Sequence, residues 1–249
     1  MERDRVKQDM GIIQAAIGDA ILTSMWVFSK PAAKVLTIII AAYLGVQARS
    51  FLGLFISTVL ATSLVVIFSF IGKALGGANF NPSTTACFYA AGLKPDYSLI
   101  SMAVRFPAQA VGGIGGAKAI LQVMPQKYRE LLKGPSLKVD LHTGGVAEGI
   151  LTFLFSFALL VIVFKGPRNM ILQVYMLAVA TVGLAIAGSG YTGPSMNPAN
   201  AYGWAYVNNW HNTWEQFYVY WICPFIGAII AAGVFRISFT PPVMKQKKA

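Results

Sequence analysis

Asn81-Pro82-Ser83 and Asn197-Pro198-Ala199 form two matching triplets, each placed after a glycine-containing approach and before a short apolar stretch. Asn is a preferred helix N-cap, and Pro suits the first helical position because the N–H that it lacks would have no partner there. The triplets therefore predict two short helices, over about 81–91 and 197–207, and Gly92 suits the end of the first. One Asn-Pro pair usually marks a turn, but two in matching halves of a chain are a stronger signal.

The composition is that of an integral membrane protein. Of the 249 residues, 56% are hydrophobic and 12% are charged, whereas soluble globular proteins are about 25% charged. Six apolar blocks approach the roughly 20 residues that cross a bilayer. They are 11–29, 51–72, 98–124, 144–164, 170–189 and 214–236. A seventh block, 35–45, is shorter, and we interpret it either as an extension of the first span or as a loop at the interface.

The two triplet stretches are too short to cross the bilayer. Irregular backbone at membrane depth is tolerated only where protein or a water-filled cavity surrounds it, so two such stretches indicate a pore or a binding site. We therefore predict an all-α membrane protein with six transmembrane helices and two re-entrant half-helices. Residues 1–249 are expected to form a single transmembrane channel domain.

An internal repeat relates the two halves of the chain, 11–124 and 144–236. The first apolar block contains Asp19 followed by Thr23, and the fourth contains Glu148 followed by Thr152, at the same spacing. Three spans separate the two triplets, so the triplets enter the membrane from opposite faces. Both loops must bury their polar ends, and we expect them to meet near the midplane as an inverted repeat.

The two asparagines suit a pore that passes water and excludes protons. Each half-helix places about half a positive charge at its N-terminus, and the amides of Asn81 and Asn197 each offer N–H donors. Two donors side by side engage both lone pairs of one water, which then cannot accept a hydrogen bond from its neighbour in the file. Together with the half-helix dipoles, this arrangement opposes a proton relay.

Asp19 and Glu148 are ionisable groups inside apolar spans, which makes them functional candidates. If they face the pathway, they suit a proton-coupled transporter. If each accepts hydrogen bonds from the buried N–H groups of its own half's re-entrant loop, the two acids are structural. Their symmetric placement favours the structural role, and Gln109 is expected to brace the same region.

The net charge of +11 excludes few classes by itself. The basic residues lie in loops and tails without interleaved aromatic residues, so anionic lipid headgroups are better partners than nucleic acid.

The two cysteines lie in apolar segments and suit buried small hydrophobes. No catalytic set, phosphate loop or metal-ligand spacing is visible, so we expect neither an enzyme nor a bound cofactor or metal.

Aromatic residues near the ends of the spans have two interpretations. They suit the aromatic belts at the membrane interfaces or simple packing in the interior. These residues are Trp26, Trp204, Trp210, Trp214, Tyr218 and Tyr220.

The paired triplets, the acid-x-x-x-Thr repeats, Ala108-Gln109 and the stretch from Tyr220 to Gly227 resemble the aquaporin family, and the resemblance covers about 11–236. The Lys-rich C-terminus and the altered first triplet look most like the plant small basic intrinsic proteins. This resemblance implies one pore per subunit, a homotetramer and residence in the endoplasmic reticulum membrane. The last five residues, Lys245-Gln246-Lys247-Lys248-Ala249, have the form of a dilysine retrieval signal, which fits cytosolic termini.

Four positions depart from the pattern of the commonest water channels. Ser83 ends the first triplet, and Asn200 stands where most of the resembled family has Arg. The other constriction positions implied by the resemblance are Pro194 and Ala185. We expect a wider, less hydrophilic constriction that passes small neutral solutes besides water. A non-conducting membrane scaffold, with its pore closed by residues such as Pro194 or Phe80, is the remaining alternative.

Replacing Asn200 with Arg is expected to narrow the solute range, because it adds a large fixed charge at the predicted constriction. Solute flux into reconstituted vesicles measures the effect. Unchanged flux would contradict a role for position 200 in the constriction.

Overall fold

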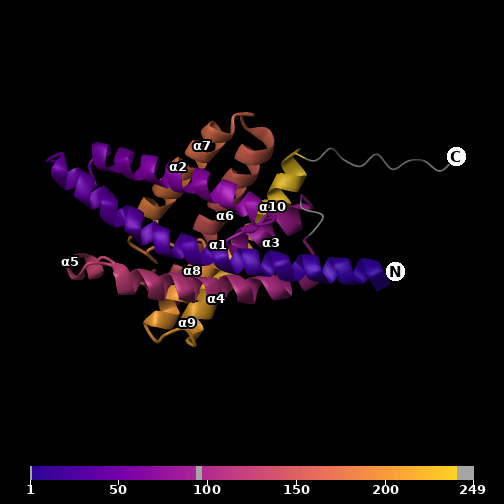
Figure 1. Cartoon of the computed structure of the whole chain (residues 1–249). Coiled ribbons are helices and arrows are strands. Elements are labelled where there is room, and N and C mark those ends of the chain that lie inside the picture. The colour runs from indigo at the N-terminus through magenta and orange to yellow at the C-terminus, as the bar shows by residue number, and fades with distance from the viewer. Residues whose placement is uncertain (1, 94–96, 240–249) are drawn as a thin grey trace.

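The computed structural model describes residues 2–93 and 97–239, and these residues form helices without any strand (Figure 1). The basic tail 240–249, with its dilysine-like motif, lies outside the described residues. The helices, in chain order, are α1 (Glu2–Tyr43), α2 (Phe51–Ala74), α3 (Pro82–Ala91), α4 (Leu99–Val123), α5 (Gln126–Arg129), α6 (Leu141–Lys165), α7 (Met170–Ala187), α8 (Pro198–Val207), α9 (Trp214–Phe217), the π-helical turn η1 (Tyr218–Ile222) and α10 (Cys223–Phe239).

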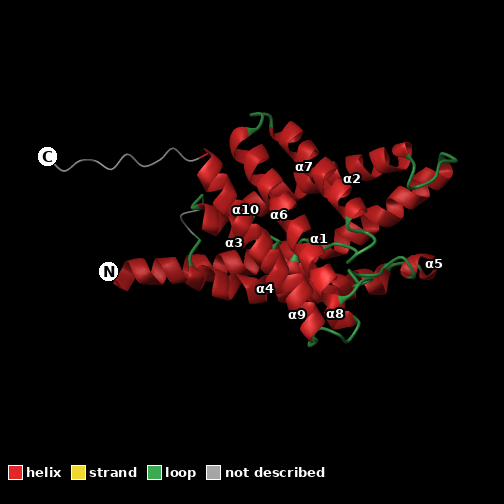
Figure 2. Ribbon diagram, turned by 180° about the vertical axis from the view of Figure 1, so that it is seen from behind, coloured by secondary structure: helices red, strands yellow, loops and turns green. Residues whose placement is uncertain are grey.

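The predicted plan of six long helices and two half-helices is confirmed. Five helical segments are long and apolar enough to cross a membrane: α1, α2, α6, α7 and the continuous stretch Trp214–Phe239. The sixth helix, α4, is as long as α6, at 25 residues, but it contains the charged residues Arg105 and Lys118. It packs against α1 and α8, and it runs beside α1 in both views (Figures 1 and 2).

The two halves pack in the same way. The contacts of α1 with α2 and α4 are matched by those of α6 with α7 and α10. Each half-helix crosses to the other half, since α3 packs on α10 and α8 packs on α4. The halves are therefore interlocked, and the two half-helices lie between them.

Helix α1 has 42 residues, about twice the number that a bilayer requires. It continues without interruption to Tyr43, so the short block 35–45 is an extension of the first span. It also contains Pro31, whose missing N–H is tolerated within the helix.

Local sequence determines where the half-helices begin. Asn81 and Asn197 have extended backbones and act as N-caps, and a proline follows each in the first turn. The side-chain oxygen of Asn81 accepts a hydrogen bond from the Ser83 N–H, and that of Asn197 accepts from Ala199 and Asn200. Helix α3 ends at Gly92, where φ is 69°, a left-handed conformation that glycine adopts without strain.

Glycines allow the long helices of each half to approach closely. A Cβ at Gly112 of α4 would overlap the carbonyl oxygen of Ala20 in α1. At the equivalent place in the second half, a Cβ at Gly227 of α10 would overlap the carbonyl oxygen of Gly149 in α6. In both halves the obstacle is backbone, which cannot move aside as a flexible side chain does.

Two aromatic residues are interior residues rather than members of an interfacial belt. Trp204 is 4% exposed and Tyr220 is fully buried, and the Tyr220 hydroxyl donates to the carbonyl of Thr192 at 3.0 Å. Trp214, at 63% exposed, remains suited to a belt. The belt interpretation is therefore wrong for Trp204 and Tyr220, because both rings fill the space around the half-helix α8.

Substituting Gly112 with Ala is expected to lower the free energy of unfolding by about 1–3 kcal/mol, the usual cost of overpacking a close contact. Thermal unfolding of the purified protein in detergent measures the change. Gly233 in α10 is the matched control, because a Cβ there meets nothing within 4 Å. Equal stability of the two alanine variants would contradict the close packing of α4 on α1.

Candidate pore at the meeting of the half-helices

The two re-entrant loops hold each other through a reciprocal pair of hydrogen bonds. Asn81 Nδ2 donates to the carbonyl of Met196, the residue before the second triplet, at 2.9 Å. Asn197 Nδ2 donates to the carbonyl of Phe80, the residue before the first triplet, also at 2.9 Å. The two triplets therefore meet, and each loop donates a hydrogen bond to a backbone carbonyl of the other.

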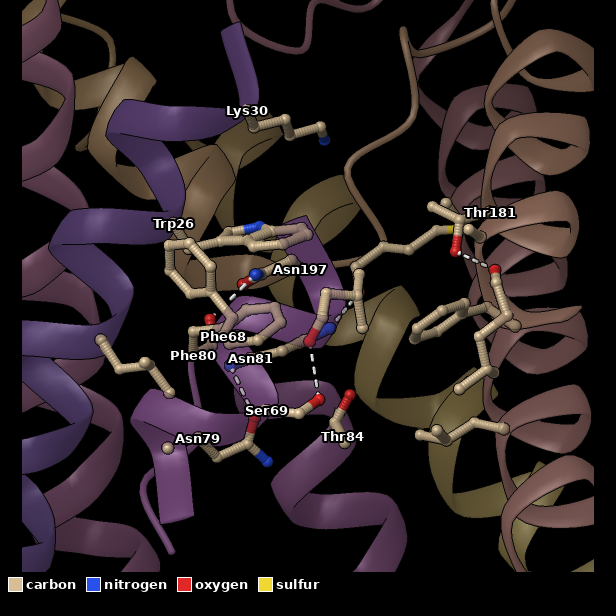
Figure 3. Close-up of a pocket in the computed structure, with 18 of the residues that line it drawn as sticks. Trp26, Lys30, Phe68, Ser69, Asn79, Phe80, Asn81, Thr84, Thr181 and Asn197 are labelled. Carbon is tan, nitrogen blue, oxygen red and sulfur yellow. Dashed lines mark hydrogen bonds between the residues drawn. The ribbon is translucent and has the colours of Figure 1, made fainter. Parts of the chain in front are cut away.

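A cavity of about 400 Å³ opens where the half-helices meet (Figure 3). Residues of α1, α2, α7 and both re-entrant loops line it, and most of the lining is apolar. Asn81 and Asn197 both line the cavity. An amide nitrogen has two N–H groups, and the crossing bond uses one on each asparagine, so one donor on each remains available.

The N-termini of α3 and α8 converge on this cavity. Each contributes a partial positive charge from its aligned peptide dipoles. The centre of the cavity therefore combines two amide donors with a positive potential, inside otherwise apolar walls.

Asp19 is fully buried and holds the first re-entrant loop. Its carboxylate accepts the Asn79 N–H at 2.7 Å and two hydrogen bonds from the Arg105 guanidinium, both at 2.7 Å. Gln109 Nε2 donates to the same carboxylate at 2.7 Å and to the Asn79 carbonyl at 3.1 Å. One carboxylate therefore connects α1, α4 and the loop.

Glu148 holds the second loop in a related way. One carboxylate oxygen accepts the backbone N–H groups of Ser195 at 2.9 Å and Met196 at 2.6 Å. The other accepts the Thr192 hydroxyl at 2.7 Å. Met196 has a positive φ of 51°, uncommon for a residue with a side chain, and the bond to Glu148 helps to hold it there.

Both acids face the loops rather than the pathway. The described residues that line the cavity include neither Asp19 nor Glu148. The partner threonines play no part in the loops: Thr152 donates to its own helix at the Glu148 carbonyl. Thr23 Oγ1 has no hydrogen-bond partner among the described residues.

Sequence reasoning missed Arg105, which makes the two halves electrostatically different. Arg105 is 3% exposed, and its guanidinium also lies 4.6 Å from the centre of the Tyr97 ring. Burial raises the pKa of the Tyr97 phenol, so this ring is neutral beside the cation. An available signal was the presence of Arg105 in a predicted span, four residues before Gln109 and so on the same helical face.

The structure brings only some of the predicted constriction residues together. Ala185 and Pro194 line the cavity. Asn200 is 2% exposed and lies outside the described lining, because its Nδ2 turns into the loop and donates to Ser195 Oγ at 2.9 Å. Ser83 is fully buried, and its hydroxyl finds no partner in the described residues and does not reach the cavity.

An aromatic cluster narrows the cavity beside the two asparagines (Figure 3). Trp26 stacks on Phe80 with ring centres 4.3 Å apart and planes at 20°. Phe68 meets both rings edge-on, at 5.4 Å from Trp26 and 6.1 Å from Phe80. Trp26 is thus a cavity residue rather than a belt residue, since α1 turns this face toward the first re-entrant loop.

The ranges 2–93 and 97–239 contain no group of three or more His, Cys, Asp or Glu residues that could hold a metal ion.

Comparison with known proteins gives consistent matches over nearly the whole chain. Residues 7–235 match the family profile described as Major intrinsic protein. The chain is 53% identical over 236 residues to Aquaporin SIP1-1 of Zea mays, covering 94% of this chain and 96% of that protein. It is 46% identical over 239 residues to Aquaporin SIP1-1 of Arabidopsis thaliana, covering 96% and 98%.

A solved structure shares the fold. The aquaglyceroporin from Plasmodium falciparum superimposes with a TM-score of 0.64, covering 92% of this chain and 95% of that chain. Only 15% of the aligned residues are identical, so the likeness concerns the fold.

Replacing Asp19 with Asn is expected to lower the free energy of unfolding by about 3–5 kcal/mol, because it leaves the buried Arg105 cation without a counter-charge. Thermal unfolding in detergent measures the loss. Adding Arg105→Gln to the Asp19→Asn variant is expected to recover part of the stability, since it removes the uncompensated charge.

Asp140 provides the matched control for this substitution. It is exposed, it caps α6, and hydrogen bonds from Thr143 hold its carboxyl pKa below the usual value. Asn is an equally good N-cap, so Asp140→Asn is expected to lower the unfolding temperature far less than Asp19→Asn does. If Asp19→Asn is tolerated as well as Asp140→Asn, the ion pair does not hold the first loop.

Proposed function

Because the chain belongs to the major intrinsic protein family, a family of membrane channels, we propose that it is a passive channel for water and small neutral solutes. The observation that carries this proposal is the cavity in which Asn81, Asn197 and the N-termini of α3 and α8 meet. Its apolar walls bind water weakly, and its few donors engage each water in turn. Membership of this family makes the chain a channel and not an enzyme.

The asparagine pair accounts for the exclusion of protons. Each amide keeps one N–H for the pathway after making its crossing bond. A water that accepts from both amides has no lone pair left for the next water, so the hydrogen-bonded file is interrupted. The half-helix dipoles add an electrostatic barrier at the same place.

The arrangement of the acids argues against a proton-coupled transporter. Asp19 is engaged by Asn79, Arg105 and Gln109. Glu148 is engaged by two loop N–H groups and a hydroxyl. A coupling group has to meet the pathway, and both acids face away from it.

One observation favours a non-conducting scaffold as the second candidate. The stacked rings of Trp26 and Phe80, with Pro194 on the same cavity, supply apolar bulk at the pathway. Under the channel proposal these residues, together with Ala185, shape the constriction. Asn200 acts indirectly, by holding Ser195 in the second loop.

We place the channel in the endoplasmic reticulum membrane as a homotetramer with both termini in the cytosol. The resemblance to plant small basic intrinsic proteins supports this, and six spans return the chain to its starting side. The apolar outer faces of α2 and α7 are the least buried of the long helices and suit contact with lipid or with a second copy.

Water flux into proteoliposomes, followed by stopped-flow light scattering, separates the candidates. The channel is expected to raise the flux above that of protein-free vesicles, with a low temperature dependence and without any proton gradient. Folded protein that conducts no water would favour the scaffold, and flux that requires a proton gradient would favour the transporter.

Substituting Asn81 with Ser is expected to reduce water flux by up to about tenfold and to raise proton leak. Ser retains the N-cap oxygen but is too short to donate to Met196 and to a passing water, a loss of about 1 kcal/mol of hydrogen bonding. Ser83→Ala is the control in the same half-helix, because the Ser83 hydroxyl is buried and outside the described lining. Full water flux through Asn81→Ser would contradict the role of the amide.

A further inference from the structure

Two lysines line the cavity, and they have no acidic counterpart there. Of the described lining residues, Lys30 and Lys73 carry charge and none is acidic. Lys30 extends from α1 beside Trp26, on the side remote from Asn79, in the close-up view (Figure 3). Its side chain has accessible surface, and its ammonium lies deep enough in the molecule to feel the charges of Glu148, behind the second loop, and of Lys34. The cavity therefore holds a net positive charge that the sequence motifs did not indicate.

The position of Lys30 differs from that of an ordinary interfacial lysine. An ionisable group in a spanning helix is costly unless it faces a water-filled cavity or a partner. Lys34 lies one helical turn further along α1 and is also exposed, but it is not among the described lining residues. Lys34 continues the same face of α1 as Trp26 and Lys30, and the described lining of the cavity on this helix ends at Lys30.

Lys30 shares its part of the cavity with the predicted constriction. Helices α1 and α7 are the first and fifth of six spans, so they run in the same direction. Lys30 and Ala185 both lie beyond the midpoints of their helices, and both line the cavity. Asn200, the neutral residue at the position where the resembled family has Arg, has turned into the loop. Of the two lysines in the described lining, Lys30 is therefore the one that lies at the same end of the cavity as Ala185.

We propose that Lys30 is the residue that keeps inorganic cations out of this pathway, with α1 supplying the charge that the second re-entrant loop lacks. The inference rests on the proposed channel function and deepens it. An ammonium about 6 Å from a passing monovalent cation lowers the occupancy of that cation by roughly threefold to a hundredfold, as the surroundings change from bulk water to a partly buried site. Neutral water carries no such penalty.

Lys73 extends the barrier toward the other end of the cavity. It lies in the last turn of α2, next to Gly72, where an added Cβ would come within 3.4 Å of the Leu22 side chain of α1. Leu22 precedes Lys30 by eight residues, or about 12 Å along the helix axis. A cation would therefore meet Lys30, the two half-helix N-termini and then Lys73, without any acidic residue to stabilise it in the described lining.

The test compares water and K⁺ flux in proteoliposomes containing the full-length chain, with Lys30→Gln as the main variant. Water flux is expected to stay within about twofold of the unsubstituted protein, and K⁺ flux is expected to rise by about tenfold. Lys30→Arg, which keeps the charge, and the matched control Lys34→Gln are both expected to show the same low K⁺ flux as the unsubstituted protein.

The outcomes separate this inference from the channel proposal. If the unsubstituted protein conducts no water, the channel proposal fails and this inference fails with it. If Lys30→Gln conducts water and its K⁺ flux does not rise, Lys30 is not the cation barrier, although the channel proposal is still supported. If Lys30→Gln loses water flux, Lys30→Met is measured in the same way. Loss of flux in both neutral variants without K⁺ leak assigns Lys30 a structural role and overturns the inference.

Discussion

The reciprocal hydrogen bonds between the re-entrant loops are the interaction on which the rest of the structure depends. Asn81 bonds to the residue before Asn197, and Asn197 bonds to the residue before Asn81. A bilayer offers no water to satisfy loop backbone, so two such loops persist at membrane depth only if protein supplies every partner. The crossed packing of α3 on α10 and α8 on α4 brings these partners together. The cavity between the halves follows from that arrangement.

The two halves satisfy the same requirement with different chemistry. Glu148 bonds two loop N–H groups and a hydroxyl, and it uses no cation in doing so. Asp19 has a shorter side chain, bonds one loop N–H, and directs its remaining capacity to Arg105 and Gln109. The inverted repeat therefore preserves the position of the acid and the path of the loop. The first half depends on a buried ion pair that has no counterpart among the described residues of the second half.

The distribution of charge follows a division between structure and pathway. The acids are buried behind the loops, where they hold backbone, and the lysines face the cavity. Under the proposed channel function, the amide donors, the two positive helix ends and the lack of an acid in the described lining are the features that would favour neutral solutes. The apolar bulk of the cavity comes from the stacked rings of Trp26 and Phe80 and from Phe68, which meets both edge-on beside the asparagines.

The sequence alone determined the number of spans, the two half-helices, the inverted repeat and the N-caps, because hydrophobic length, capping and repeat order are local properties of the chain. Only the tertiary structure decided which side chains meet at the cavity. Arg105 was not singled out from the sequence, Lys30 fell just beyond the first predicted span, and Trp26 was left open between an interfacial belt and interior packing. Asn200 was expected at the constriction but turns to Ser195. Each outcome depends on the rotation of one helix against its neighbours, which packing sets and local sequence does not encode.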